Sequence, residues 1–333
     1  MVLFWLSVLA LAVLLYVLLD GFDLGVGILF GFARKEASRR AMMRAVEPVW
    51  DGNETWLVVS GVVLWGAFPA AYSILFAALY IPVLFMLTGL VLRGVAFEFR
   101  ERASEAFRWL WSVAFFGGSL LAAFMQGVMV GALVEGLAIG DGHYVGGAMN
   151  WLTPFAVLSG LGLCLGYALL GAGWLLVKSD GELSGAARRW IPRLALALLA
   201  VLIAVFGYAL SKDFRILHRW LERPYLFVFP VVAVAAAAML ASRAREERYQ
   251  DRTPFEVMTI LFAMAFGTFL ISFWPYVIPF SVTIDEAAGP HSSLAFMFWG
   301  EGLFILPLML FYTSVAYRVF RGKLQLRPVD IEY

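Results

Sequence analysis

Two aspartates, three residues apart, lie within a long apolar run near the start of the chain. They are Asp20 and Asp23. A carboxylate at membrane depth costs several kcal/mol unless it is paired, solvated or protonated. Residues at this spacing share one helix face, and a nearby like charge favours protonation of one of them. The pair indicates proton or ion movement. The alternative interpretation is that each acid caps a helix end or pairs with Arg93 or Arg100.

A second acidic pair opens the next apolar run. Asp51 and Glu54 follow the spacing of a capping box, with Asp51 at the N-cap and Glu54 three residues later. Capping and proton handling are compatible for Asp51, because a helix terminus at the membrane surface is an entry point for water. For Glu54, capping and proton chemistry remain alternatives. Trp50 and Trp56 are typical of an interfacial aromatic belt.

Two charged residues near the end of the third apolar run are candidate counter-ions. Arg93 is the deeper one and is expected to pair with Asp20 or Asp23. Glu98 lies nearer the surface and is expected to pair with Arg100 or Arg102, which would contribute little to stability.

A further acid, Glu301, stands between two glycines in the last apolar run. About ten residues of helix precede it, and at about 1.5 Å per residue this predicts a position near the bilayer centre. It is a candidate buried proton relay or a protonated structural acid.

The composition is that of a membrane protein. The chain has 333 residues, of which 62% are hydrophobic and 15% charged, whereas soluble domains are about 45–50% apolar and about 25% charged. A net charge of +1 gives no electrostatic reason to expect a nucleic-acid partner. The single cysteine, Cys164, excludes a disulfide framework. The histidines lack a partner histidine at helical spacing, so no metal site is predicted; they are His143, His218 and His291.

Apolar runs predict a single all-α membrane domain over residues 1–333, with nine transmembrane helices. The predicted spans are 3–32, 54–72, 74–97, 109–133, 152–177, 191–210, 224–241, 255–278 and 292–319. Most Lys and Arg residues follow the first, third, fifth, seventh and last spans. The positive-inside rule therefore predicts a periplasmic N-terminus and a cytoplasmic C-terminus. It also places both acidic pairs on the cytoplasmic side.

Several ordered motifs resemble subunit II of cytochrome bd-type quinol oxidases. They are Asp-Gly-Phe-Asp-Leu-Gly-Val-Gly at 20–27, Pro-Val-Trp-Asp-Gly-Asn-Glu-Thr-Trp-Leu at 48–57, the segment 93–100, Trp-Pro-Tyr at 274–276 and the segment 312–323. The resemblance is dense over about the first hundred and last sixty residues. The stretch Asp285-Glu286-Ala-Ala points to the cyanide-insensitive branch of the family.

The resemblance implies two four-helix bundles plus one peripheral helix in a bacterial inner membrane. It implies a heterodimer with a haem-bearing subunit I that oxidises quinol, reduces dioxygen to water and takes protons from the cytoplasm. Haem b558, haem b595 and haem d would be ligated by that partner. A structural quinone, a small accessory membrane subunit and lipid are further candidates for the complex. Asp51 matches the family's proton-path aspartate, Asp20 and Asp23 match its first-helix acids, and Glu301 matches no family motif.

Two other interpretations use the same residues. A proton-coupled secondary transporter could employ the acids as coupling sites, although the paired repeats and interrupted helices of such transporters are not evident. A purely structural subunit would use every acid as a cap or an ion-pair partner.

Overall fold

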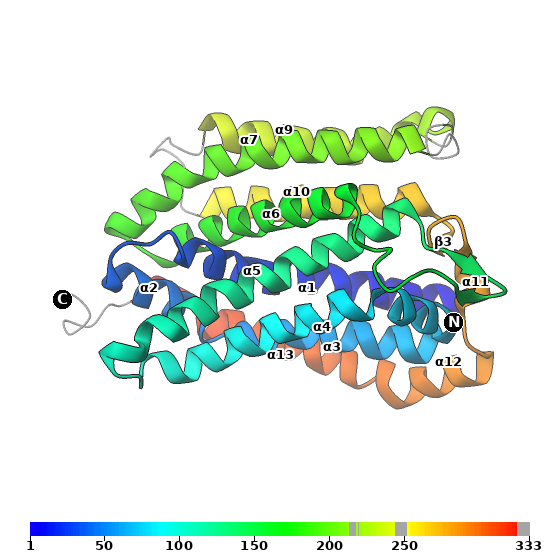
Figure 1. The fold of residues 1–333 in the computed structure, drawn as a ribbon, viewed down its shortest axis with the longest axis horizontal. Helices are drawn as coiled ribbons and strands as arrows, with labels where there is room; N and C mark the ends of the chain where they lie inside the picture. The colour runs from blue at the N-terminus through cyan, green and yellow to red at the C-terminus, as the bar shows by residue number, and fades with distance from the viewer. Residues whose placement is uncertain (213–217, 219, 244–251, 325–333) are drawn as a thin grey trace.

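The computed structural model describes residues 1–212, 218, 220–243 and 252–324, and these are almost entirely helical (Figure 1). The helices are α1 (Val2–Phe30), α2 (Glu36–Val46), α3 (Trp50–Ala67), α4 (Pro69–Arg100), α5 (Glu105–Glu135), α6 (Pro154–Lys178), α7 (Gly181–Lys212), α9 (Val228–Arg243), α10 (Arg252–Phe273), α11 (Ile284–Ala287), α12 (His291–Met297) and α13 (Ile305–Val319). A 3-10 turn, η1 (Pro224–Phe227), precedes α9, and a π-helical turn, η2 (Phe298–Gly302), joins α12 to α13.

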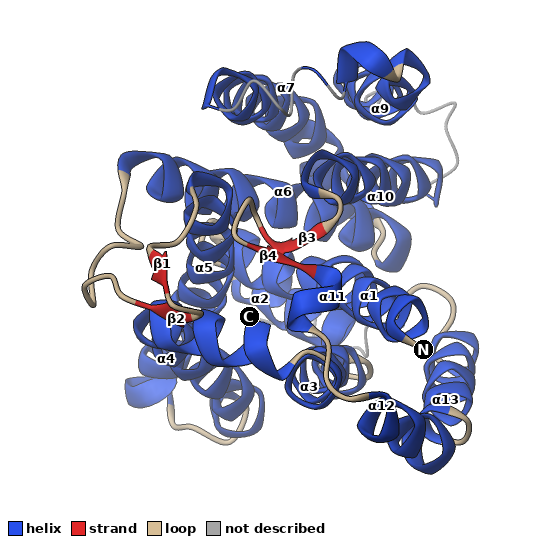
Figure 2. Cartoon of the chain, turned by 90° about the vertical axis from the view of Figure 1, so that its right-hand side faces the viewer, coloured by secondary structure: helices blue, strands red, loops and turns tan. Residues whose placement is uncertain are grey.

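Two short antiparallel hairpins are the only strands among the described residues. Strand β1 (Ile139–Gly140) pairs with β2 (His143–Tyr144), and β3 (Tyr276–Ile278) pairs with β4 (Val282–Thr283). Figure 2 shows both hairpins at the end of the bundle where α1 begins.

Helix α1 occupies the centre of the fold. It packs against α3, α5 and α6, while α4 packs on α5. Helix α10 lies beside α6, and α7 and α9 form a further layer over these two (Figure 1). Every residue of α1 from Asp20 to Phe30 is buried, whereas its first half exposes Leu3 and Leu11. A helix that is enclosed on all sides needs no polar stripe, so the run is apolar all round except for its two acids.

Helices α1 and α6 meet backbone to backbone. A Cβ atom placed on Gly25 would lie 1.7 Å from the carbonyl oxygen of Tyr167, and one placed on Gly171 would lie 2.4 Å from the carbonyl carbon of Gly25. Small residues permit such close helix contacts in membranes, where packing rather than the hydrophobic effect drives association. Beside this contact, the rings of Phe22 and Trp174 stack with centroids 4.2 Å apart.

Eight helices in the described part of the chain are long and apolar enough to cross a membrane. The second predicted span corresponds to α3. Its mean hydropathy is too low for it to be among these eight, because its first turns carry Asp51, Asn53 and Glu54. Its 18 residues correspond to about 27 Å of helix, close to the thickness of a hydrocarbon core. Helix α3 runs back along α1, with Asn53 bonded to Asp23 near one end and Ala67 in the cluster around Trp5 at the other. A ninth span stays a prediction that this geometry supports.

Several predicted boundaries are wrong, and the causes are local. The second span ends at Ala67 rather than residue 72 because Pro69 starts α4 at a position that suits proline. The predicted helix 255–278 ends at Phe273, and Tyr276–Ile278 forms a strand. Helix α7 begins at Gly181, well before the predicted residue 191. Helix α2 was not predicted because its sequence is polar and contains no apolar run.

The first and last helices point the same way. Gly302 lies against Trp5 near the start of α1, and the ring of Tyr317 lies 6.4 Å from that of Phe22 further along it. Parallel first and last helices require an odd number of crossings if every helix between them spans the membrane. The predicted sidedness of the termini agrees with this arrangement and stays a prediction.

A capping box lies at the end of the bundle that carries the two hairpins. It makes the stability of the fold depend on pH. The backbone N–H and the hydroxyl of Thr283 donate hydrogen bonds of 2.8 and 2.7 Å to Glu286, which lower the pKa of that carboxyl below its usual value. Because the folded state has the lower pKa, the ionised carboxylate stabilises the fold above the unfolded pKa, and this contribution is lost as the pH falls through the folded value.

We therefore expect Glu286→Gln to lower the thermal midpoint of the purified protein slightly at neutral pH, with the difference shrinking as the pH falls below about 4. Asp285→Asn, an exposed acid of the same turn, is the matched control and should cause no such pH-dependent loss. Equal pH profiles for the two variants would contradict the capping role.

Candidate functional site

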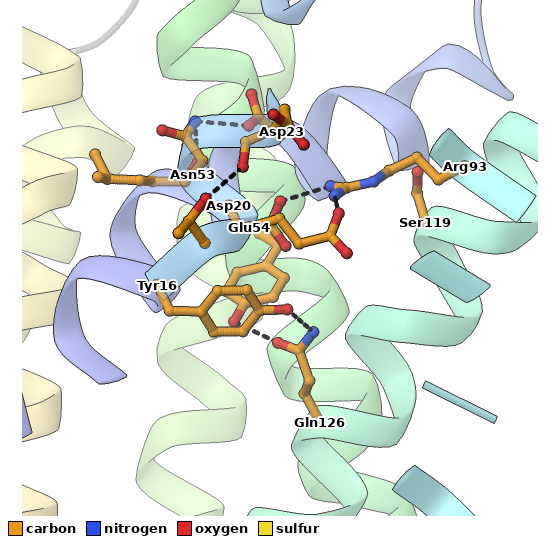
Figure 3. Close-up of polar contacts among 12 residues, drawn as sticks. Tyr16, Asp20, Asp23, Asn53, Glu54, Arg93, Ser119 and Gln126 are labelled. Atoms are coloured by element: carbon orange, nitrogen blue, oxygen red, sulfur yellow. Dashed lines mark hydrogen bonds and ion pairs between the residues drawn. The ribbon is translucent and has the colours of Figure 1, made fainter. Parts of the chain in front are cut away.

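A buried arginine holds two carboxylates in the interior of the helix bundle. Arg93 Nη1 lies 2.7 Å from Asp20 Oδ1, and Arg93 Nη2 lies 2.8 Å from Glu54 Oε2 (Figure 3). The side chains of Arg93 and Asp20 are fully buried, and that of Glu54 is 28% exposed. Arg93 is thus the counter-ion of Asp20, and it draws Glu54 into the same cluster. The three residues come from α4, α1 and α3.

The second aspartate of α1 has a different environment. Asp23 Oδ2 accepts a hydrogen bond of 2.7 Å from Asn53 Nδ2, and Asn53 Oδ1 accepts one of 2.8 Å from the hydroxyl of Tyr317. Asn53 and Tyr317 were missed by the sequence analysis. Asn53 lies between the two acids of α3, one helical turn from the start of the helix, which is the signal that would have indicated it.

A third polar group lies one turn away from Asp20 on α1. Gln126 Nε2 donates to the hydroxyl of Tyr16 at 2.7 Å, and the hydroxyl of Tyr167 donates to Gln126 Oε1 at 2.8 Å (Figure 3). All three side chains are buried. Mutual hydrogen bonding of this kind lets polar side chains persist in an apolar interior. A lone glutamine within an apolar run was the available sequence signal.

The capping interpretation of Asp51 and Glu54 is wrong. Helix α3 begins at Trp50, its N-cap is Val49, and no side chain caps it. Asp51 therefore lies in the first turn of the helix, and its side chain is exposed. Glu54 points to Arg93 instead of back to the helix start. The helix begins two residues earlier than the pattern requires, so the two acids do not bracket its N-terminus.

The other charged candidates lie outside the cluster. Glu98 pairs with Arg102 at 3.4 Å on an exposed surface. Arg100 is buried, but it binds Glu36 at 2.9 Å and the hydroxyl of Ser112 at 2.9 Å. Arg100 therefore ties α2 to the ends of α4 and α5, and the alternative in which it pairs with the first-helix acids is wrong.

Glu301 is exposed in this chain and lies in the π-helical turn η2. Its neighbour Gly302 contacts Trp5, so Glu301 lies level with the first turn of α1. The expectation of a buried acid at the bilayer centre is therefore wrong for this chain taken alone. The last helix begins against the end of α3, where Met297 meets Gly66, so its first ten residues do not carry it to the middle of the bundle.

The described part of the chain does not fit a haem or a redox metal. All three histidines are exposed, and His218 pairs with Glu222 at 3.0 Å. No three His, Cys, Asp or Glu side chains gather in a way that could hold a metal ion within the described ranges. The buried methionines lie in the close-packed core; they are Met42, Met43, Met86, Met125 and Met258.

Fold and site together define a polytopic α-helical membrane protein with a buried charge cluster near one end of its bundle. A family model described as cytochrome bd terminal oxidase subunit II matches residues 1–320. The chain belongs to this family, as its motifs predicted. It is accordingly a subunit of a terminal oxidase and a multi-pass protein of the bacterial inner membrane.

Individual relatives align over nearly their whole length. The chain is 28% identical to cytochrome bd-I ubiquinol oxidase subunit 2 of Escherichia coli K12, with 93% of this chain and 92% of that protein covered. It is 26% identical to cytochrome bd ubiquinol oxidase subunit 2 of Bacillus subtilis, with 96% and 95% covered. The solved structure of bd oxidase from Geobacillus thermodenitrificans contains a chain of the same fold, with a TM-score of 0.75, 19% identity, and 96% and 98% covered.

Proposed function

We propose that this chain is the subunit of a quinol:oxygen oxidoreductase that ligates no haem, supports a haem-bearing subunit I and lines a cytoplasmic route for proton uptake. Its family membership and its relatives, which are named as ubiquinol oxidase subunits, support the reaction. The enzyme oxidises quinol, reduces dioxygen to water and needs both subunits for activity. No observation favours a proton-coupled transporter, and placement in the cyanide-insensitive branch stays a prediction.

The partner subunit supplies the redox centres in this proposal. Haem b558, haem b595 and haem d carry electrons to dioxygen when bound there. The exposed histidines and the packed methionines of the present chain support this division of labour. The whole chain forms one membrane domain of two four-helix bundles and a peripheral helix. A structural quinone, lipid and a small accessory subunit complete the proposed assembly.

The acids of α1 and α3 form a gradient of burial, and this gradient is the observation that carries the proton route. Asp51 is exposed, Glu54 one turn later is 28% exposed, and Asp20 beyond Arg93 is fully buried. Carboxylates that lead inward from a surface provide successive sites for a proton. The pairing of Arg93 with Asp20 and Glu54 also offsets part of the desolvation cost of burying these two acids.

The cluster lies near the end of the bundle that is rich in Lys and Arg. The end of α1, Phe30, is about 10 Å along the helix from Asp23. Its ring faces the guanidinium groups of Arg39 and Arg100, at 5.5 and 5.1 Å. The positive-inside rule assigns that end to the cytoplasm, the side from which an oxidase that conserves energy takes up protons.

The test is Asp51→Asn in the assembled oxidase. We expect turnover to fall roughly tenfold or more, as for loss of a proton-transfer group, while haem content and subunit ratio stay unchanged. Oxygen consumption with excess quinol and the haem absorbance of the same preparation measure both quantities.

The matched control is Glu98→Gln, which removes an exposed carboxyl at the same end of the bundle and outside the cluster. It should leave turnover unchanged. Full activity in Asp51→Asn would remove Asp51 from the route, and equal losses in both variants would indicate a general surface-charge effect.

A further inference from the structure

Asp23 is a buried acid to which the structure gives no cation. Its exposed fraction is 1%, and its hydrogen-bond donor is the neutral amide of Asn53. The guanidinium of Arg93 lies in the same cluster, but its two Nη groups bind Asp20 and Glu54. Asp23 is therefore the carboxyl of this cluster that lacks direct compensation.

The charges of the cluster do not balance when all of its acids are ionised. Three carboxyls share one guanidinium, which leaves an excess of two negative charges; the groups are Asp20, Asp23, Glu54 and Arg93. Glu54 is partly exposed and can be solvated, whereas Asp23 is not accessible to bulk solvent. A buried carboxylate without a cation neutralises itself by taking up a proton, because a bare charge in an apolar interior is far more costly.

The hydrogen bonds of Asn53 indicate which oxygen of Asp23 carries the proton. Asn53 Nδ2 lies 3.3 Å from the carbonyl oxygen of Leu19 and 2.7 Å from Asp23 Oδ2, so both neighbours of this nitrogen are acceptors. Asn53 Oδ1 in turn accepts from Tyr317. The amide orientation is thus defined by its surroundings, and Asp23 Oδ2 is an acceptor. The proton belongs on Asp23 Oδ1.

Two buried oxygens of the acidic pair, Asp23 Oδ1 and Asp20 Oδ2, lack a hydrogen-bond partner at normal distance, and the hydroxyl of Tyr16 is a further group that can donate to Asp20. Asp20 and Asp23 are one helical turn apart on the same face of α1. A proton on Asp23 Oδ1 would make that oxygen a hydrogen-bond donor. Asp20 Oδ2 would then accept this hydrogen bond. Buried polar atoms in native proteins almost always have a hydrogen-bond partner. A single proton on Asp23 would give both of these oxygens one.

We propose that Asp23 is a neutral carboxylic acid in the resting protein, with its proton on Oδ1, and that it shares this proton with Asp20 Oδ2 directly or through one water molecule. Only the use of this proton in turnover rests on the function proposed above. Asp23 is then the proton-storing residue of the route, and Asp20, Arg93 and Glu54 are its charged neighbours. Asn53 is a positioning residue, since its amide holds Asp23 but relays no proton.

The surroundings of Asp23 contain few other titratable groups. Tyr317 of α13 reaches it through Asn53, while α6 and α10 present the rings of Trp174 and Phe255 around Phe22. A cavity of about 10 Å³ adjoins Asn53 and has room for about one water molecule. Its lining includes Pro48 just before α3, Gly52 in the first turn of α3, and Tyr312 and Tyr317 of α13. The cavity therefore brings solvent as far as Asn53, and Asp23 does not line it.

The test is infrared spectroscopy of the whole oxidase complex during exchange from H₂O to D₂O. A protonated carboxylic acid has a C=O stretching band, well separated from that of a carboxylate, which shifts down on deuteration. We expect the wild-type complex to show such a band and Asp23→Asn to lack it. Glu98→Gln, the exposed control, should keep the band unchanged. A wild-type band that persists in Asp23→Asn, or no band at all, overturns the proposal.

A second variant keeps the test decisive if Asp23→Asn does not assemble. Tyr317→Phe removes the hydroxyl that Asn53 Oδ1 accepts, alters the donor to Asp23 and leaves the acid in place. The band should then shift in frequency without being lost, and an unshifted band overturns the assignment to Asp23. If Asp51→Asn retains full turnover while the Asp23 band is present, the proposed proton route is wrong and the protonation of Asp23 is upheld. If Asp51→Asn lowers turnover but no Asp23 band is found, only the proposal that Asp23 is protonated is wrong.

Discussion

Replacing Arg93 by leucine is expected to prevent recovery of an intact oxidase complex. Arg93 is the cation that binds both Asp20 and Glu54, at 2.7 and 2.8 Å. Removing one partner of a buried ion pair typically costs about 3–5 kcal/mol, because the remaining charge stays buried without compensation. That is a large share of the ~5–15 kcal/mol by which proteins are stable. The yield of haem-containing complex and its thermal midpoint in detergent measure the effect.

Two further substitutions separate charge from geometry. Arg93→Lys keeps the positive charge, but an ammonium group lacks the planar fork that binds two carboxylates, so we expect an intermediate loss. Arg102→Leu removes an arginine whose pair with Glu98 is exposed, and should change stability by no more than about 0.5 kcal/mol. A complex with Arg93→Leu that is as stable as one with Arg102→Leu would show that the cluster needs no internal cation.

Substituting Gly25 by alanine is expected to separate α1 from α6 and to lower the thermal midpoint strongly. The added methyl carbon would lie 1.7 Å from the carbonyl oxygen of Tyr167, and a backbone atom cannot rotate away as a side chain can. Overpacking a close-packed interior typically costs about 1–3 kcal/mol, and more where the backbone must move. Since Gly25 is two residues from Asp23, the shift would also disturb the acid pair. Thermal unfolding and infrared spectra of one preparation report both effects.

The matched control is Gly61→Ala in α3. No atom lies within 4 Å of a Cβ placed there, so the methyl group meets open space. Alanine is also a better helix former than glycine by about 1 kcal/mol. We expect unchanged or slightly raised stability for Gly61→Ala. Equal destabilisation by the two substitutions would mean that the contact between α1 and α6 is looser than described.

The sequence alone predicted the features that depend on composition along one helix. Apolar runs and blocks of Lys and Arg indicated the helices and their direction, because hydropathy and charge are local properties of the chain. Two acids within such a run indicated a buried polar site, since lipid rejects uncompensated charge. Arg93 could be named as a counter-ion because it was the deepest cation on the predicted side. The family motifs could also be recognised in the sequence alone, and the match to the family model confirmed the family that they indicated.

The identity of each partner was decided only by the tertiary structure. Asp20 and Arg93 are 73 residues apart, and Asn53 and Tyr317 are 264 apart. Whether such side chains meet depends on how far each helix is rotated about its axis and displaced along it, which no local pattern records. That is why Glu54 proved to be an ion-pair partner rather than a cap, and why Glu301 lies level with the first turn of α1 rather than in the middle of the bundle. Local chemistry determined that a buried acid needs a partner or a proton, and helix packing determined which residues supply it.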